Sequence, residues 1–228
     1  MNRKPHALLA ATLIFLAPVV FAQNVKLAHV SLGMNEAEVK TALASSTPSY
    51  HPHGSKFADL SYLIANTEGE QYAFTMIDGR VAAFSLMHIL PPGQQPFLPP
   101  GQEPTVSTLR NLIIQRTWTP TAIHKGNTFW ISNSTGAPLS DATQCNLKSG
   151  EDWLPFSPMQ TSKPDDSAPK STEGLMKPSL ASYPASCGVS IHLRMTPSES
   201  ENDRVSTVRI QVLDMKAMNA FLAKHSQR

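Results

Sequence analysis

The stretch Leu32–Leu43 constrains the fold more than any other part of the chain, because it contains a complete helix start. Asn35 is suited to the N-cap, since its side-chain oxygen can accept a hydrogen bond from a free backbone N–H of the first turn. Glu38 follows three residues later and can bond back to the Asn35 N–H, which makes a capping box. We therefore predict a helix over residues 35–45.

The residues after this helix predict three antiparallel strands. Residues 60–66, 71–77 and 81–90 are rich in apolar and aromatic side chains, and the middle segment places its largest apolar side chains on one face. Asp78-Gly79, between the last two segments, is typical of a two-residue hairpin turn. The first unit is therefore one helix followed by an antiparallel meander.

A proline-rich segment separates this unit from the rest of the chain. Residues 91–104 hold six prolines and two glycines, which disfavour both a helix and a central strand. Such a composition predicts a stiff connector of the polyproline II type. It divides the chain into a first unit, 23–90, and a second unit, 105–228.

We interpret the second unit as a weaker copy of the first. The matches between the units keep their order, at offsets of 70, then 67, then 124 residues. The matching positions are Val39, Ala42 and Leu43 with Leu109, Leu112 and Ile113, then 67–69 with 134–136, then 78–81 with 202–205. The jump in the offset implies an insertion of 57 residues within the second meander. We therefore predict an α+β fold of two helix-plus-antiparallel-meander repeats, the second with a long disordered insertion.

The composition of the second unit locates the insertion. Residues 146–186 are dominated by Ser, Pro, Lys and Asp, which predicts an irregular, mobile segment. Beyond it, Gly188–Met195 alternates apolar with polar side chains, and so does a last strand around Ile210. Asp214 is suited to cap a C-terminal helix. The apolar side chains of that helix that we expect to face the core are Ala217, Met218, Phe221 and Leu222.

The first 22 residues have the composition of a secretory signal. Arg3 and Lys4 precede the apolar run Leu8–Phe21, and Ala22 ends a small-residue cleavage pattern. An uncleaved membrane anchor is the alternative, although the run is short for a membrane span. We expect a periplasmic or secreted protein that starts at Gln23 and keeps no transmembrane segment after cleavage.

The charge balance of the mature chain disfavours two classes of partner. Removal of Arg3 and Lys4 lowers the 19 basic residues to 17, equal to the 17 acidic residues, so the net charge is zero. Binding to nucleic acid or to an anionic membrane needs clustered cations, and the sequence has no basic run. We therefore expect neither partner.

An exported chain carries its two cysteines, Cys145 and Cys187, into an oxidising compartment. We predict a disulfide between them, which would join the two ends of the insertion covalently. A free thiol pair for redox or metal chemistry is the alternative, but the spacing matches no CxxC or zinc motif. Closing a loop of this length is worth about 4 kcal/mol in the loop-entropy estimate.

The opening strand followed by LGMNEAEVKTAL resembles the repeat unit of the small outer-membrane-assembly lipoproteins and of the tandem-repeat β-lactamase-inhibitor proteins. In those families a Gly-Met-x-x-x-x-Val helix start precedes a loop and an antiparallel sheet. The likeness covers residues 27–43 closely and residues 57–90 in pattern. The resemblance implies a tandem α/β fold and a habit of binding other macromolecules, and the whole layout resembles exported bacterial proteins.

We find no stretch with the pattern of a catalytic centre or a cofactor site. His51 and His53, with His88 as a candidate third ligand, could hold a metal, but histidines around a proline in a Ser-rich loop are more often solvated. The S-x-x-K string Ser167–Lys170 falls in low-complexity sequence, where no rigid frame aligns a nucleophile with a base. We therefore predict a non-enzymatic protein without metal or cofactor, and a small hydrolase or metal-dependent enzyme is the alternative.

We expect one face of the sheet to pack under the helices and the other to be open. The binding prediction concerns the open face. The predicted binding residues on the open face are Trp130, His192, Arg194 and Arg209, with Gln211 beside them. Tryptophan and arginine are enriched among interface anchors. The alternative keeps Trp130 in the core and leaves Phe129 partly exposed. The expected partner is a protein or another envelope macromolecule with an acidic or aromatic surface, and a purely structural envelope protein is a third reading.

Overall fold

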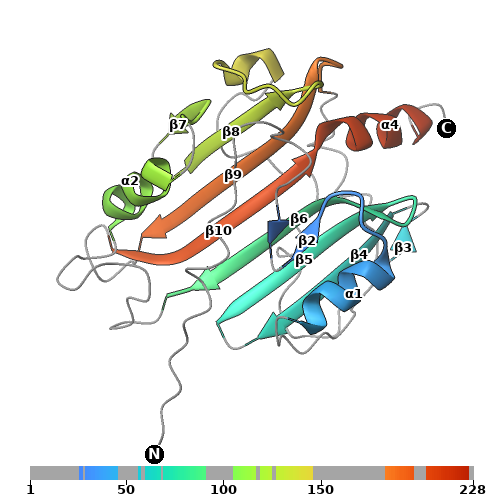
Figure 1. Ribbon diagram of the computed structural model, residues 1–228, viewed down its shortest axis with the longest axis horizontal. Helices are drawn as coiled ribbons and strands as arrows, with labels where there is room; N and C mark the ends of the chain where they lie inside the picture. Colours follow the sequence, from blue (N-terminus) through green and yellow to red (C-terminus); the bar gives the residue numbers. More distant parts are fainter. Residues whose placement is uncertain are drawn as a thin grey trace, which may run out of the picture.

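In the computed structural model, eight strands form one antiparallel sheet in the order β3-β4-β5-β6-β10-β9-β8-β7 (Figure 1). The structure describes residues 26–27, 29–45, 56–57, 60–67, 69–90, 105–116, 119–124, 127–145, 183–197 and 204–225. The fold is therefore α+β with an antiparallel sheet, as predicted.

The first half of the described chain contributes one helix and four strands of this sheet. They are α1 (Glu36–Ala44), β3 (Lys56–Phe57), β4 (Leu60–Thr67), β5 (Glu70–Ile77) and β6 (Arg80–Ile89). Before them, β1 (Lys26–Leu27) and β2 (Val30–Ser31) pair as a separate two-stranded sheet. The three predicted strands of the meander are confirmed, and β3 is a short strand that the sequence analysis did not predict.

The second half contributes the remaining strands and helices. They are α2 (Val106–Arg116), β7 (Ala122–His124), β8 (Asn127–Asn133), the 3-10 helix η1 (Ala142–Cys145), β9 (Cys187–Pro197), β10 (Val205–Asp214) and α4 (Met215–His225). The two halves meet where β6 pairs with β10, with Leu86 opposite Ile210.

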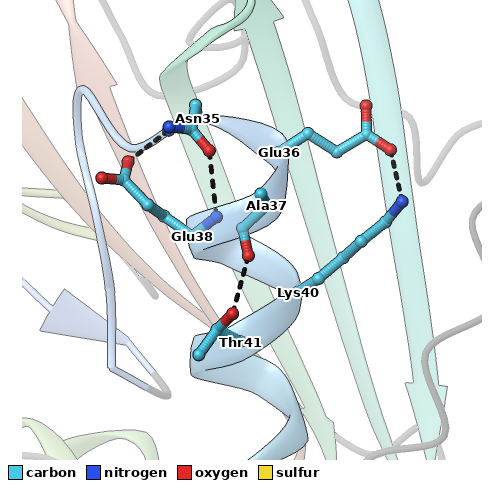
Figure 2. A network of polar contacts seen from close by, with 6 residues as sticks. All are labelled: Asn35, Glu36, Ala37, Glu38, Lys40 and Thr41. Atoms are coloured by element: carbon cyan, nitrogen blue, oxygen red, sulfur yellow. Dashed lines mark hydrogen bonds and ion pairs between the residues drawn. The ribbon is translucent and has the colours of Figure 1, made fainter.

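The predicted start of α1 is confirmed in atomic detail (Figure 2). The Glu38 backbone N–H donates to Asn35 Oδ1 at 3.0 Å, and the Asn35 N–H donates to Glu38 Oε2 at 2.7 Å. Both bonds of the capping box are therefore present, and they satisfy donors that a helix start otherwise leaves free. The buried side chains of α1 are Val39 and Leu43, which face the sheet's core as their spacing predicts.

The hairpin between β5 and β6 turns at the predicted dipeptide. Asp78 has φ of 48° and Gly79 has φ of 73°, so both central residues are left-handed, as a type I′ turn requires. Ile77 then pairs with Arg80 and Met76 with Val81, after which a β-bulge shifts the register so that Thr75 pairs with Ala83. The local sequence thus sets the position of this turn, whereas the bulge determines the register of the rest of the hairpin.

Helices α1 and α2 cover one face of the sheet, which we call the first face. A single apolar cluster there joins α1 and α2 with strands of both halves, through residues such as Leu43, Leu109, Phe74, Ile191 and Val212. The cluster spans the β6–β10 junction, so the two halves share one core. Burial of these apolar side chains in one cluster holds the two halves together through the hydrophobic effect.

The opposite face, which we call the second face, is partly covered by α4 and η1. Met215, Met218 and Phe221 of α4 pack in a cluster with Leu213 and Ile131 of the sheet. The expectation that all helices cover one side of the sheet is therefore wrong. The cap of α4 is as predicted, because Asp214 Oδ1 accepts from the backbone N–H groups of the next turn at 2.9 and 3.0 Å.

The predicted disulfide is present. Cys145, at the end of η1, bonds to Cys187, the first residue of β9, with a Cα–Cα distance of 5.8 Å. Both residues are fully buried in the cluster on the second face. The bond closes a separation of 42 residues, for which the loop-entropy estimate is about 4 kcal/mol.

Three predicted segments lie outside the described residues. They are the signal peptide, 1–22, the proline-rich connector, 91–104, and residues 146–182 of the predicted insertion. Within the ranges that the structure describes, no helix is both long enough and apolar enough to span a membrane.

Candidate functional site

Trp130 does not lie on the same face as the other predicted binding residues. It pairs with Ile191 across β8 and β9, belongs to the core of the first face and is only 4% exposed. The prediction that Trp130 and His192 share a face is wrong, because the register places Phe129, not Trp130, opposite His192. Strand alternation then sends the two aromatic side chains to opposite faces.

Phe129 takes the place on the second face that Trp130 was predicted to hold. Its ring centroid lies 4.4 Å from that of His192, with 19° between the ring planes. The alternative is right that Trp130 lies in the core and wrong that Phe129 is partly exposed, because Phe129 is buried as well. Both sides of β8 are covered, which is why neither aromatic residue is exposed.

His192 is buried at the centre of a polar network that joins three strands. Its Nδ1 lies 3.1 Å from Gln211 Oε1 on β10, and its Nε2 lies 2.8 Å from Asn127 Oδ1 on β8. A neutral imidazole has one N–H donor and one acceptor nitrogen, so one of the two amides must present its NH₂ group to the ring. The network holds β8, β9 and β10 in register on the second face.

The environment of His192 keeps its imidazole neutral at pH 7. Burial is the main cause that lowers the pKa of His192 to about 4, and the charges of Arg194 and Arg209 lower it further. The hydrogen bond with Gln211 acts in the opposite direction without outweighing burial. His192 therefore adds no positive charge beside the two arginines under neutral conditions.

Arg194 and Arg209 are directly opposite each other on β9 and β10. Arg194 is exposed, while Arg209 is half-buried and its Nη2 donates to Met87 Sδ at 3.5 Å. Burial first, and then the charge of Arg194, lowers the pKa of Arg209. Directly opposed like charges destabilise an antiparallel pair, so this arrangement has an energetic cost.

No carboxylate compensates the arginine pair within the described residues. The ion pairs found there join Glu36 with Lys40, Glu70 with His88, and Asp78 with Lys224. Neither Arg194 nor Arg209 makes an ion pair in this part of the chain. Two uncompensated guanidinium groups side by side can bind an anionic group, since each has several N–H donors.

The arginines belong to a row of side chains that crosses five neighbouring strands on the second face. Following the register from β5 to β8, this arginine row consists of Gln71, Met87, Arg209, Arg194 and Asn127. The next row, Ala73, Ser85, Gln211, His192 and Phe129, is buried. Beyond the arginine row, Ile89 is 49% exposed. The arginine row is thus where the second face passes from buried to exposed.

The buried Oε1 atom of Gln71 has no hydrogen-bond partner in the described part of the row. An unsatisfied buried acceptor costs free energy, so this end of the row is not optimised for stability.

Of the candidate metal ligands, His88 lies within the described structure, where it pairs with a carboxylate. His88 Nδ1 lies 3.1 Å from Glu70 Oε1, and Tyr72 donates its hydroxyl to Glu70 Oε2 at 2.9 Å. The hydrogen bond with His88 is the largest cause of the lowered pKa of Glu70. Burial is the main cause of the raised pKa of Tyr72. His51 and His53 lie outside the described residues, and the described ones contain no group of three side chains suited to a metal.

Sequence reasoning found four members of the site but missed the rest. His192, Arg194, Arg209 and Gln211 share the second face, as predicted, but His192 and Gln211 are buried there and the prediction that they lie on an open surface is wrong. Asn127, Phe129 and Met87 also belong there, and only the strand register reveals them. Their alternation along β6 and β8 was visible in the sequence, but alternation alone does not say which parity shares a face with His192.

No family model matches this chain, and no curated protein or solved structure is significantly similar to it.

Proposed function

We propose that this chain is an exported, non-enzymatic protein that binds another macromolecule of the cell envelope, in the periplasm or outside the cell. The observation that carries the proposal is the pair Arg194 and Arg209, which stand opposed at the exposed end of the second face and have no carboxylate partner among the residues that the structure describes. A fold does not retain opposed like charges for stability, so a partner that neutralises them is the physical explanation we favour. The buried disulfide is compatible with export.

We also propose that the two halves are copies of the helix-plus-meander unit that the sequence resembles. If two such copies pair through equivalent strands, the sheet has an approximate twofold axis between those strands. A residue at this axis then pairs with the equivalent residue of the other copy. The offset of 124 residues found near residues 78–81 relates Leu86 to Ile210, and these two residues are Cα partners. This coincidence of offset and register supports an internal duplication and, with it, a binding role of the kind that the resemblance implies.

Affinity capture tests the proposed function. The mature protein is immobilised, exposed to envelope extract, and the retained macromolecules are identified by mass spectrometry. We expect a partner that the parent retains and that an Arg194→Gln/Arg209→Gln variant loses. A Lys40→Gln/Lys224→Gln variant removes the same charge at exposed sites far from the row and should retain the partner. Equal retention by all three proteins would contradict the proposal.

A further inference from the structure

We infer that the arginine row docks a peptide segment of a protein partner, with an acidic side chain of the peptide held between Arg194 and Arg209. This inference rests on the proposed function and names the chemistry of its partner. It is argued from charge, from the donors that remain available and from the apolar surface beside them.

The first step is the charge. The two guanidinium groups project from directly opposed positions of neighbouring strands, and Cβ atoms at such positions lie within about 5.5 Å of each other. A carboxylate between them can accept hydrogen bonds from both, and ionic hydrogen bonds of this kind are about twice as strong as neutral ones. Binding also removes the repulsion between the two arginines.

The second step is the weak contact that Arg209 now makes. Its Nη2 donates to a thioether sulfur, Met87 Sδ, at 3.5 Å, and sulfur is a poor acceptor. A carboxylate is a much better acceptor and can displace this contact at little cost. Because Arg209 is half-buried, its attraction for an anion is screened less than that of a surface arginine.

The third step concerns the surface next to the charge. Met87 is half-buried and Ile89, two residues further along the same side of β6, is 49% exposed. An apolar side chain next to the acidic residue of a partner can pack on this pair, which a free phosphate or acetate could not use. The row therefore matches a peptide that combines acidic and apolar side chains.

The fourth step separates a peptide from a phosphate-rich surface. Membranes and nucleic acids are bound by many spaced cations, whereas the described row holds two. Lys40 lies on α1, which covers the first face, and Lys224 pairs with Asp78 of the turn between β5 and β6. A compact pair of arginines suits a single carboxylate better than a surface that carries many phosphate groups.

The test uses a fluorescein-labelled Leu-Glu-Leu-Glu-Leu peptide with blocked ends, and fluorescence anisotropy with the mature, oxidised protein. A peptide with Gln in place of Glu is the matched probe. We expect the Glu peptide to bind at least about tenfold more tightly than the Gln peptide, and more weakly at high salt. Arg194→Gln/Arg209→Gln should weaken binding at least about tenfold, whereas Lys40→Gln/Lys224→Gln should not.

A folding control and three further measurements test the inference. Circular dichroism melting must show that the arginine variants fold, and the Arg194→Lys/Arg209→Lys variant, which keeps the charge, should recover part of the affinity. If phosphatidylglycerol vesicles or inorganic phosphate displace the peptide at lower concentration than the peptide's own Kd, the ligand is a phosphate and the inference is wrong. If sedimentation shows a dimer that the double Gln variant abolishes, a second copy occupies the row and the inference is wrong.

The outcomes also separate this inference from the proposed function. If the parent captures an envelope partner in an arginine-dependent manner but binds Glu and Gln peptides equally, the acidic-peptide inference fails and the proposed function stands. If the captured partner is retained by the double Gln variant as well, the proposed function fails whatever the peptides do.

Discussion

Gly188 illustrates how a single residue can be required by its backbone neighbours. A Cβ atom added there would collide with the backbone oxygen of Asn133 and would lie 2.9 Å from Ser132 Oγ. The Ser132 hydroxyl accepts a hydrogen bond from the Val189 N–H at 3.0 Å, which draws the two strands close beside the disulfide. A close approach of this kind is what a strand glycine permits.

We predict that Gly188→Ala destabilises the protein by about 1–3 kcal/mol, because a backbone oxygen cannot move aside as a side chain can. Urea unfolding measures the change. Gly136→Ala is the control. Gly136 has a left-handed φ of 91°, and a Cβ added there would meet no heavy atom within 4 Å, so this variant tests backbone strain without a collision. An unchanged midpoint for Gly188→Ala would show that the strands can separate at no cost.

His192 makes the stability of the protein depend on pH. Its folded pKa of about 4 lies below the value of 6.5 for an unperturbed histidine, so the unfolded chain takes up a proton first as the pH falls. Stability therefore decreases as the pH falls from about 6.5 towards 4, by about 2 kcal/mol between pH 7 and pH 5.

We predict that His192→Gln loses this part of the pH dependence, because glutamine can hydrogen-bond within the network and does not titrate. Urea midpoints at pH 7 and pH 5, for parent and variant, measure the difference. Other titrating groups, including Glu70, are common to both proteins and cancel in the comparison. Equal slopes for the two proteins would mean that His192 is as easily protonated in the folded state as in the unfolded one.

At the scale of elements, the start of α1 is the part of the structure that local sequence specifies best. Asn35→Ala removes the side-chain half of the capping box, and we predict a loss of about 1 kcal/mol. The control is Lys40→Ala, which breaks an exposed ion pair with Glu36 and should cost less than about 0.5 kcal/mol. Thermal melting of both variants gives the comparison, and an Asn35→Ala protein as stable as Lys40→Ala would show that the cap is dispensable.

The C-terminal helix shows the limit of element-level prediction. Asp214 and the apolar spacing of Met218 and Phe221 predicted both the start of α4 and the side that packs. They did not predict that α4 packs on the face opposite α1 and α2, because amphipathic spacing selects a side of the helix and not a face of the sheet. The predicted open face is consequently smaller than expected.

At the scale of the whole molecule, the shared core on the first face makes the two halves one cooperative structure. Leu43 in the first half and Trp130 in the second belong to the same cluster, which crosses the β6–β10 junction. The proline-rich segment divided the sequence into two units without indicating whether they share a sheet, and in the structure the strands of both units form one sheet.

We predict that Leu43→Ala shifts the unfolding transition recorded at Trp130, with a loss of about 2–5 kcal/mol from the cavity. The measurement is Trp130 fluorescence during urea unfolding, in a background where Trp118 and Trp153 are replaced by Phe. Lys40→Ala, on the exposed side of the same helix, is the control. A Trp130 transition that stays in place while circular dichroism shows a separate early step would mean that the halves unfold independently.

The sequence by itself determined the features that depend on near neighbours in the chain. The capping box at Asn35, the turn at Asp78-Gly79 and the cap at Asp214 each need contacts within a few residues, so spacing alone predicted them. The Cys145–Cys187 bond followed from the count of cysteines, because the chain offers one pairing. The set His192, Arg194 and Arg209 followed from strand alternation and correct pairing of the last two strands.

The tertiary structure alone decided where the site lies and what surrounds it. Trp130 and Phe129 are adjacent and both aromatic, so the sequence does not show which of them shares a face with His192. The register between β8 and β9, strands far apart in the sequence, decides this. The burial of His192 depends on this register as well, because Phe129 stacks on its ring and Asn127 bonds to it. A shift of one residue in strand pairing reverses every side chain, and only long-range packing selects among such registers.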